Sequence, residues 1–165
     1  MFALFSVGVA LADGAETPQV LYQEVSTALS GGEPWKIIDY VVPEDRALIA
    51  GSFAMMAGLT ANGDAATAEL QAIGDRYGIK PVGEALTSDE YEVIMRTAYA
   101  DVTDYHGLSQ DLWAFMKAHG GAEGEVVVPK LKGGSSPHPA LKIGKQKLPL
   151  VLREGRWYIQ GEDAS

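Results

Sequence analysis

The stretch EVVVPKLKGGSSPHPALKIGKQKLPLVLREGRWYIQ, residues 125–160, is the part of the chain in which apolar and polar side chains alternate over a long distance. Successive side chains of a β-strand point to opposite faces of a sheet, so alternation predicts strands with one buried face. The alternating runs are residues 125–132, 140–143, 147–153 and 156–160. We therefore expect a four-stranded antiparallel sheet in the C-terminal part of the chain.

The two faces of this predicted sheet differ in charge. One parity is apolar, as in Leu148, Leu150 and Leu152. The opposite parity carries the basic residues Lys130, Lys132, Lys142, Lys147 and Arg153. Two interpretations stay open for these cations. In the first, they dock an anionic ligand or an acidic partner. In the second, they keep edge strands from pairing with other chains, which is a common use of lysine.

Residues 17–119 show helical patterns instead. Thr17 precedes a proline and is a good N-cap, and Thr87 with Glu90 forms a capping box. The uncharged stretch 47–61 predicts a central helix that is covered on several sides. We expect five or six N-terminal helices packed on one face of the C-terminal sheet, which is an α+β fold.

The first residues, 1–12, read MFALFSVGVALA and end in an Ala-x-Ala pattern. This pattern is typical of the apolar region and cleavage site of a secretory signal peptide, although no basic residue precedes it. It predicts export to the periplasm or the medium, followed by a single α+β domain over 13–165. The other interpretation is a cytoplasmic protein with a buried N-terminal element. Neither this segment nor 47–61 reaches the roughly 20 residues of a transmembrane helix.

The charge of the chain is acidic and unevenly distributed. The net charge is −9; residues 1–124 hold 18 acids and 6 bases, whereas residues 125–165 hold 4 acids and 7 bases. An acidic chain repels nucleic acid and anionic lipid, so we expect neither as a partner. The absence of cysteine excludes disulfides and thiolate chemistry.

The candidate ligand-binding residues are Asp101, Asp104, His106 and Trp157. The helix that begins at the capping box is predicted to end near His106, with Ser109 capping the last helix. Asp101 and Asp104 would then share a helix face, and with His106 they would form a carboxylate–imidazole pair suited to proton transfer. The alternative is a solvated acidic face, with His106 favoured near a helix C-terminus.

The sequence contains none of several common catalytic and cofactor-binding motifs. No G-x-S-x-G elbow, phosphate-binding loop, dinucleotide-binding loop or H-E-x-x-H pair occurs. The three histidines, His106, His119 and His138, are far apart in the sequence. We therefore expect no metal site and no cofactor.

Several segments together resemble a known family. They are the helix at 18–30, the break at Gly31-Gly32, the helix start Pro43-Glu44-Asp45, and the terminal hairpin LREGRWYI at 152–159. This order resembles the nuclear-transport-factor-2-like (SnoaL-like) domains of exported bacterial proteins. The resemblance implies a cone of helices around a curved sheet, with a pocket that is an enzyme site in some members and a binding surface in many others.

Three hypotheses of function follow. The leading one is an exported, non-catalytic small domain that binds a ligand or a protein partner. The alternative is a small pocket enzyme that uses Asp101 or Asp104 with His106 as an acid–base pair. The third is a homodimer formed through the 47–61 helix, which a bulky or charged residue at Ala54 would disrupt.

A polar cavity between the helices and the sheet would favour a ligand site or an enzyme. A solid apolar core there would favour a protein-interaction domain with its site on the outer surface.

Overall fold

The protein is described here by a computed structural model, which covers residues 14–81, 87–121 and 128–161. Its α-helices are α1 Pro18–Ser30, α2 Arg46–Thr60, α3 Asp64–Tyr77, α4 Ser88–Ala98 and α5 Tyr105–Ala118. The short 3-10 helices η1 (Pro34–Tyr40) and η2 (Pro43–Asp45) lie between α1 and α2. The strands are β1 Lys130–Lys132, β2 Ala140–Ile143, β3 Gln146–Arg153 and β4 Arg156–Ile159. The predicted α+β order, with helices first and the sheet last, is confirmed.

The strands form an antiparallel sheet in the order β1-β2-β3-β4, as the alternation predicted. Residues 125–127 of the first predicted strand lie outside the described residues. Ala15 and Val41 each form an isolated bridge to β4, so short extended segments line its outer edge. Leu152 was predicted on the buried face but is 57% exposed, whereas Leu150 of the same parity is buried.

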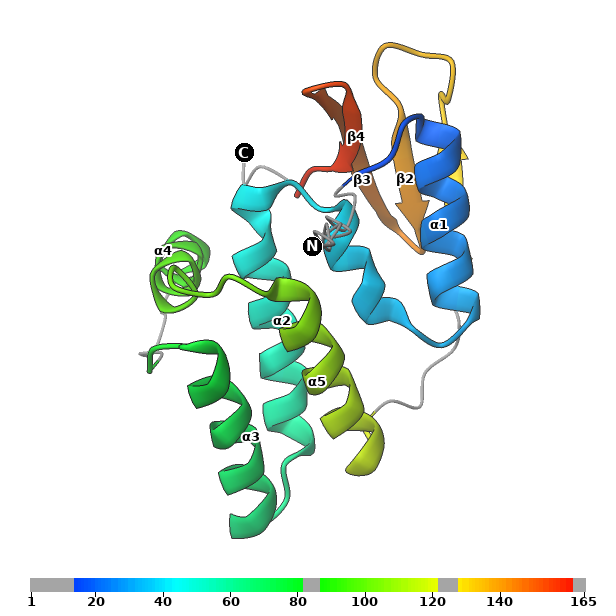
Figure 1. Ribbon diagram of the computed structural model, residues 1–165. Helices are drawn as coiled ribbons and strands as arrows, with labels where there is room; N and C mark the ends of the chain where they lie inside the picture. Colours follow the sequence, from blue (N-terminus) through cyan, green and yellow to red (C-terminus); the bar gives the residue numbers. More distant parts are fainter. Residues whose placement is uncertain (1–13, 82–86, 122–127, 162–165) are drawn as a thin grey trace, which may run out of the picture.

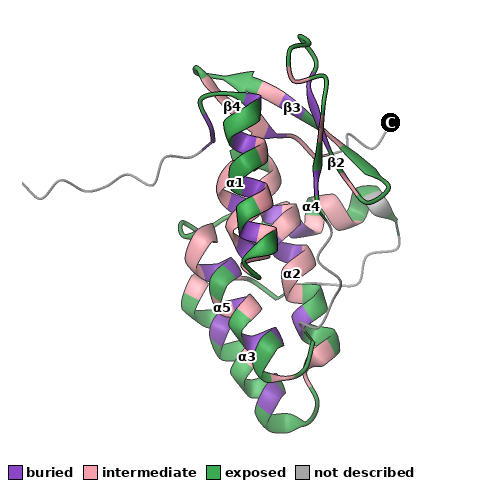
Figure 2. Ribbon diagram, turned by 90° about the vertical axis from the view of Figure 1, so that its right-hand side faces the viewer, coloured by how far each residue is buried: buried purple, intermediate pink, exposed green. Residues whose placement is uncertain are grey.

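Two clusters of buried apolar residues hold the described chain together. One lies among α2, α3, α4 and α5, with Leu108, Leu112 and Phe115 of α5 nearly inaccessible to solvent. The other lies between α1 and the sheet. Figure 1 shows the corresponding arrangement, with α1 beside the strands and α2–α5 grouped in the other half. In Figure 2 the buried residues of α1 form a stripe along the helix.

The space between α1 and the inner face of the sheet is filled with apolar side chains. Leu21 and Val25 of α1 are fully buried, and they cluster with Leu141, Leu150 and Ile159 of the sheet. Burial of apolar surface stabilises a fold by about 25 cal/mol per Å². The inner sheet face therefore forms part of the apolar core.

Local capping signals are confirmed, but one helix boundary was predicted wrongly. Thr17 caps α1, and Thr87 and Glu90 form both hydrogen bonds of the capping box. However, α4 ends at Ala98 and α5 begins at Tyr105. Asp104 caps α5 because its side chain accepts a hydrogen bond from the Gly107 backbone N–H at 2.8 Å.

This boundary changes the environment of the candidate residues. His106 lies in the first turn of α5 rather than near the end of the preceding helix. Asp101 lies in the turn after α4, so Asp101 and Asp104 do not share a helix face. Ser109 is buried inside α5 and is not its cap.

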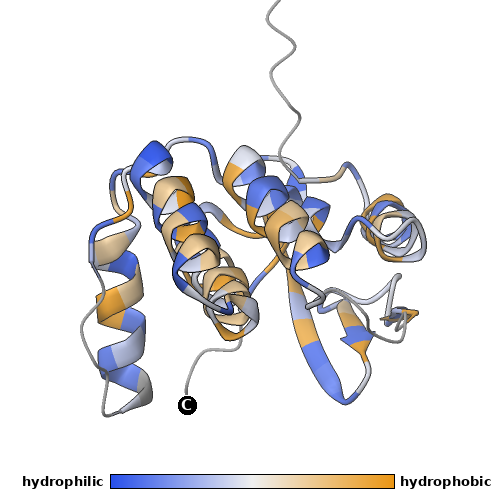
Figure 3. Cartoon of the chain, turned by 90° about the horizontal axis from the view of Figure 1, so that it is seen from below, coloured by the Kyte–Doolittle hydropathy of each residue, from blue (hydrophilic) through white to orange (hydrophobic). Residues whose placement is uncertain are grey.

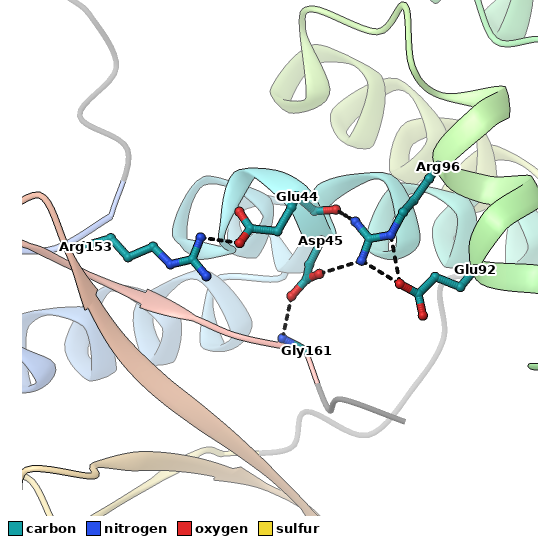
Figure 4. A network of polar contacts seen from close by, with 6 residues as sticks. All are labelled: Glu44, Asp45, Glu92, Arg96, Arg153 and Gly161. Carbon is teal, nitrogen blue, oxygen red and sulfur yellow. Dashed lines mark hydrogen bonds and ion pairs between the residues drawn. The ribbon is translucent and has the colours of Figure 1, made fainter. Parts of the chain in front are cut away.

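A polar network at η2 ties α4 to the end of the sheet (Figure 4). Arg96 of α4 contacts Oδ1 of Asp45 at 3.1 Å and donates to the backbone oxygen of Glu44. Asp45 accepts a second hydrogen bond, at 2.9 Å, from the backbone N–H of Gly161. The Glu44 side chain pairs with Arg153 of β3. Hydrogen bonding to its own backbone N–H, followed by the bond from Arg153, lowers the pKa of Glu44.

None of the helices in the described ranges has the length and apolar character needed to cross a membrane. Several of them carry both hydrophilic and hydrophobic residues (Figure 3).

Candidate functional site

Asp39 of η1 and His106 of α5 form a close side-chain pair. Nδ1 of His106 lies 2.8 Å from Oδ2 of Asp39 and 3.0 Å from Oδ1. An ionised carboxylate only accepts hydrogen bonds, so Nδ1 carries a proton and donates it. Trp35, also in η1, packs edge-on against the imidazole with ring centroids 4.8 Å apart. These two contacts fix the orientation of the ring.

A pocket of about 180 Å³ lies beside this pair. We call it the Asp39–His106 pocket; its lining residues are Ile38, Asp39, Arg46, Thr103, Asp104, Tyr105 and His106. Binding sites for drug-sized ligands usually occupy about 300–1,000 Å³. This pocket therefore accommodates only a compact molecule.

Most polar groups around the pocket have a structural partner. Asp104 caps α5, and the Tyr105 hydroxyl donates to the backbone oxygen of Tyr99 at 2.9 Å. Burial raises the pKa of Tyr105, and Arg46 acts in the opposite direction, so the hydroxyl stays protonated at neutral pH. No hydrogen bond to Nε2 of His106 is formed by the part of the chain that the structure describes. The His106 side chain itself is one of the groups that line the pocket.

The structure brings together two of the four predicted site residues. Asp104 and His106 both line the pocket, but the carboxylate that holds His106 is Asp39. Asp101 instead forms a 2.9 Å ion pair with Lys80, and both side chains are more than half exposed. Trp157 lies in β4, bridges to Ala15, and is partly buried against the apolar cluster between α1 and the sheet.

Asp39 was not predicted, because only carboxylates close to His106 along the chain were considered as its partners. Asp39 precedes His106 by 67 residues and has no motif around it. Its one local signal is the flanking pattern of η1, in which Trp35 and Ile38 are buried and leave Asp39 at the boundary of the core.

His119 is the second histidine with an acidic partner. Its Nε2 lies 3.1 Å from Oε2 of Glu69, and its ring stacks on Phe115 with centroids 4.3 Å apart. Neither Glu69 nor His119 lines the Asp39–His106 pocket. Among the described residues, no three histidine or acidic side chains are grouped so that they could hold a metal ion.

A second candidate site lies on the outer face of the sheet. A hollow of about 340 Å³, here called the lysine groove, is lined by Val128, Lys130, Lys132, Lys142 and Gly144. The strand register places Lys130 directly opposite Lys142, and Lys142 directly opposite Lys147. Side chains in such pairs have Cβ atoms about 4.5–5.5 Å apart, and like charges at that distance are destabilising.

The charges of the lysine groove are not neutralised within the described chain. No carboxylate of residues 14–81, 87–121 or 128–161 lies within 4.0 Å of Nζ of Lys130, Lys132, Lys142 or Lys147. Lys36 and Lys80, in contrast, form ion pairs with Glu33 and Asp101. The lysine groove is therefore a concentration of positive charge on a protein with a net charge of −9.

Comparisons of the chain with models of known protein families, with curated proteins and with solved structures found no match. The nuclear-transport-factor-2-like resemblance therefore stays a prediction. The two sites have to be interpreted from their own chemistry.

Proposed function

We propose that this chain is a small, non-catalytic binding domain that docks an anionic partner in the lysine groove. The observation that carries the proposal is the row of directly opposed lysines, Lys130–Lys142–Lys147, without an acidic partner in the described chain. Such a row costs electrostatic free energy in the isolated domain. An anion bound in the groove would remove this repulsion and form several charge-assisted hydrogen bonds.

Protection of a sheet edge explains only part of this row. Lysine on an edge strand discourages pairing with other chains. Lys130 lies in β1 at the edge, but Lys142 lies in β2 and is paired on both sides, with Lys130 of β1 and with Lys147 of β3. An interior position needs no such protection, so Lys142 supports the binding role.

Binding to inorganic tripolyphosphate, a short anion that fits within the groove, tests this function when it is measured by calorimetry at low salt. We expect binding that the double variant K130Q/K142Q weakens about fivefold, since one exposed ion pair contributes a factor of roughly 1.5 to 5. The matched control K80Q/K117Q makes the same change in net charge outside the groove, and it should bind like the unmodified protein. Equal weakening by both double variants would mean that net charge alone is responsible, and the proposal would fail.

The Asp39–His106 pocket supports a second candidate function, acid–base catalysis on a compact substrate. A carboxylate at Nδ1 fixes the tautomer that leaves Nε2 able to accept a proton, and it stabilises the imidazolium that forms. With a small ester, Nε2 of His106 would take a proton from water as the water oxygen attacks the carbonyl carbon. The bond to the alkoxide would then break, and the imidazolium would give the proton to the leaving oxygen, which yields the acid, the alcohol and neutral His106.

Hydrolysis of p-nitrophenyl acetate distinguishes this candidate from a purely structural pair. Catalysis by His106 predicts that H106Q lowers the rate about 100-fold or more. The control H119Q removes the other carboxylate-paired histidine, and it should leave the rate unchanged. If H106Q and H119Q have the same rate as the unmodified protein, the pocket is not a hydrolytic site.

The proposal includes export from the cytoplasm. Its support is the apolar stretch of residues 1–12 with its Ala-x-Ala ending, a pattern typical of cleaved signal peptides. Mass spectrometry of the protein from fractionated cells tests it. An N-terminus after Ala12 in the exported fraction is expected, and a cytoplasmic protein that keeps residues 1–12 would refute it.

We also propose self-association through α2, with Leu59 rather than Ala54 as the contact residue. Ala54 packs partly against the helical core, whereas Met55, Met56 and Leu59 are 57%, 42% and 80% exposed. Exposed apolar groups of this kind favour association. If α2 mediates a dimer, L59E should yield a monomer in analytical ultracentrifugation. A monomeric unmodified protein at high concentration would end this part of the proposal.

A further inference from the structure

The outer face of β1 and of the two residues before it combines charge with an apolar side chain. Val128, Lys130 and Lys132 occupy alternate positions and all line the lysine groove, and Val128 is 59% exposed. Alternate residues of an extended chain lie about 6.4–6.8 Å apart on one face. A matching ligand has one apolar group and two anionic groups at that repeat. Polyphosphate has no apolar group, whereas the side chains of an extended polypeptide supply all three.

β1 is also an edge of the sheet. Within the described residues no strand pairs with its second edge, while the opposite edge, at β4, is bridged by Ala15 and Val41. Extended segments commonly bind along such edges. Lys130 and Lys132 repel the same edge of another copy but attract an acidic segment, so the charge selects the kind of chain that binds.

The charge of the remaining chain limits the length of the partner. Residues 1–124 carry 18 acids against 6 bases. A long polyanion such as nucleic acid would pass from the groove into the field of these acids and be repelled. A short segment with two carboxylates keeps its charge inside the groove.

From these three observations, and resting on the anionic docking proposed above, we propose that the partner is an acidic protein segment in extended conformation. Its side chains follow the order apolar-x-acidic-x-acidic, or the reverse for the opposite chain direction. The carboxylates face Lys130 and Lys132, with Lys142 beside them, and the apolar side chain covers Val128.

Three capped peptides test the pattern against the whole chain by fluorescence anisotropy at low salt. The first, Gly-Leu-Ser-Glu-Ser-Glu-Gly, has the proposed spacing; the second has the same composition with its glutamates adjacent; the third carries glutamine in place of glutamate. We expect the first to bind at least about fivefold more tightly than the other two. K130Q/K132Q should remove this difference, and K80Q/K117Q should preserve it.

A charge-reversal experiment tests for a gain of binding. The variant K130E/K132E should bind the peptide in which both glutamates of the first peptide are replaced by lysine. Inorganic tripolyphosphate separates the two levels of the proposal. If K130Q/K132Q weakens binding of tripolyphosphate, but the spaced peptide binds no better than the adjacent one, the acidic-segment partner is wrong and anionic docking stands. If neither probe binds in a lysine-dependent way, both are wrong.

Discussion

Asp39 and His106 are separated by 67 residues in the chain, yet Oδ2 of one lies 2.8 Å from Nδ1 of the other. The pair joins η1 to the first turn of α5, and η1 leads directly to the segment that bridges to β4. It therefore connects the helical half of the protein to the half that contains the sheet. Loss of the pair should therefore lower the free energy of unfolding.

Replacement of Asp39 by Asn tests the mechanical role of the pair. The neutral amide loses the charge-assisted bond to His106, so the free energy of unfolding should fall by about 1 kcal/mol. Urea denaturation at pH 7 measures it. E69Q is the matched control, because it alters the corresponding carboxylate of the more exposed Glu69–His119 pair; it should cost less. An equal loss in both variants would contradict the linking role of Asp39.

Gly107 should be required for the cap of α5. A Cβ at this position would collide with the capping carboxylate of Asp104 and would lie 2.9 Å from the Tyr77 hydroxyl. G107A should therefore destabilise the protein by about 1–2 kcal/mol, the usual value of a lost N-cap. G58A provides the contrast, because Gly58 is in α2 with nothing within 4 Å of a new Cβ. There alanine should stabilise by up to about 1 kcal/mol, and a loss comparable to that of G107A would argue against the cap mechanism.

The protein should lose stability at alkaline pH through two tyrosines. Burial raises the pKa of Tyr99 to about 12 from its ordinary value of 10. Burial, followed by the hydrogen bond to Asp111, does the same for Tyr77. A raised pKa means that the folded state keeps its protons longer, so this contribution is complete below pH 10 and is lost as the pH rises through about 12. Urea midpoints between pH 8 and 12 should show the decline, and Y77F/Y99F should flatten it. A decline of the same size in the double variant would assign it to other groups.

Arg96 should hold α4 against η2. Its guanidinium contacts Asp45 and Glu92 and donates to the backbone of Glu44 (Figure 4). The single ammonium group of lysine cannot make these contacts together, as the planar guanidinium does. R96K should therefore increase the hydrogen-exchange rate of the α4 amides nearly as much as R96Q does. K117R, an exposed basic exchange in α5, should leave α4 unchanged. Full protection of α4 in R96K would show that charge alone is sufficient.

Much of the architecture was predictable because its signals are local. The capping residues Thr17 and Thr87 act on backbone groups within one helical turn. The alternation in 140–143 and 147–153 directly reports which side chains share a sheet face. The same parity also placed the basic residues on the outer face, before any register was known.

The errors share a different origin. The start of α5 was placed too late, because the N-cap is Asp104, and Ser109 is buried inside the helix. Leu152 has the parity of a core residue but is 57% exposed. Burial is a property of the neighbours, and these are not visible in a local pattern.

Both candidate sites likewise needed the tertiary structure. Sequence inspection identified Asp104 and His106 as candidates, but only packing of η1 on α5 brings Asp39 to the imidazole. The lysines were identified by type and parity, but only the strand register sets Lys130 and Lys142 opposite one another. Secondary structure and strand faces follow from interactions within a few residues. Sites built from distant segments follow from how the apolar faces pack, because hydrophobic burial is non-directional and leaves no motif in the chain.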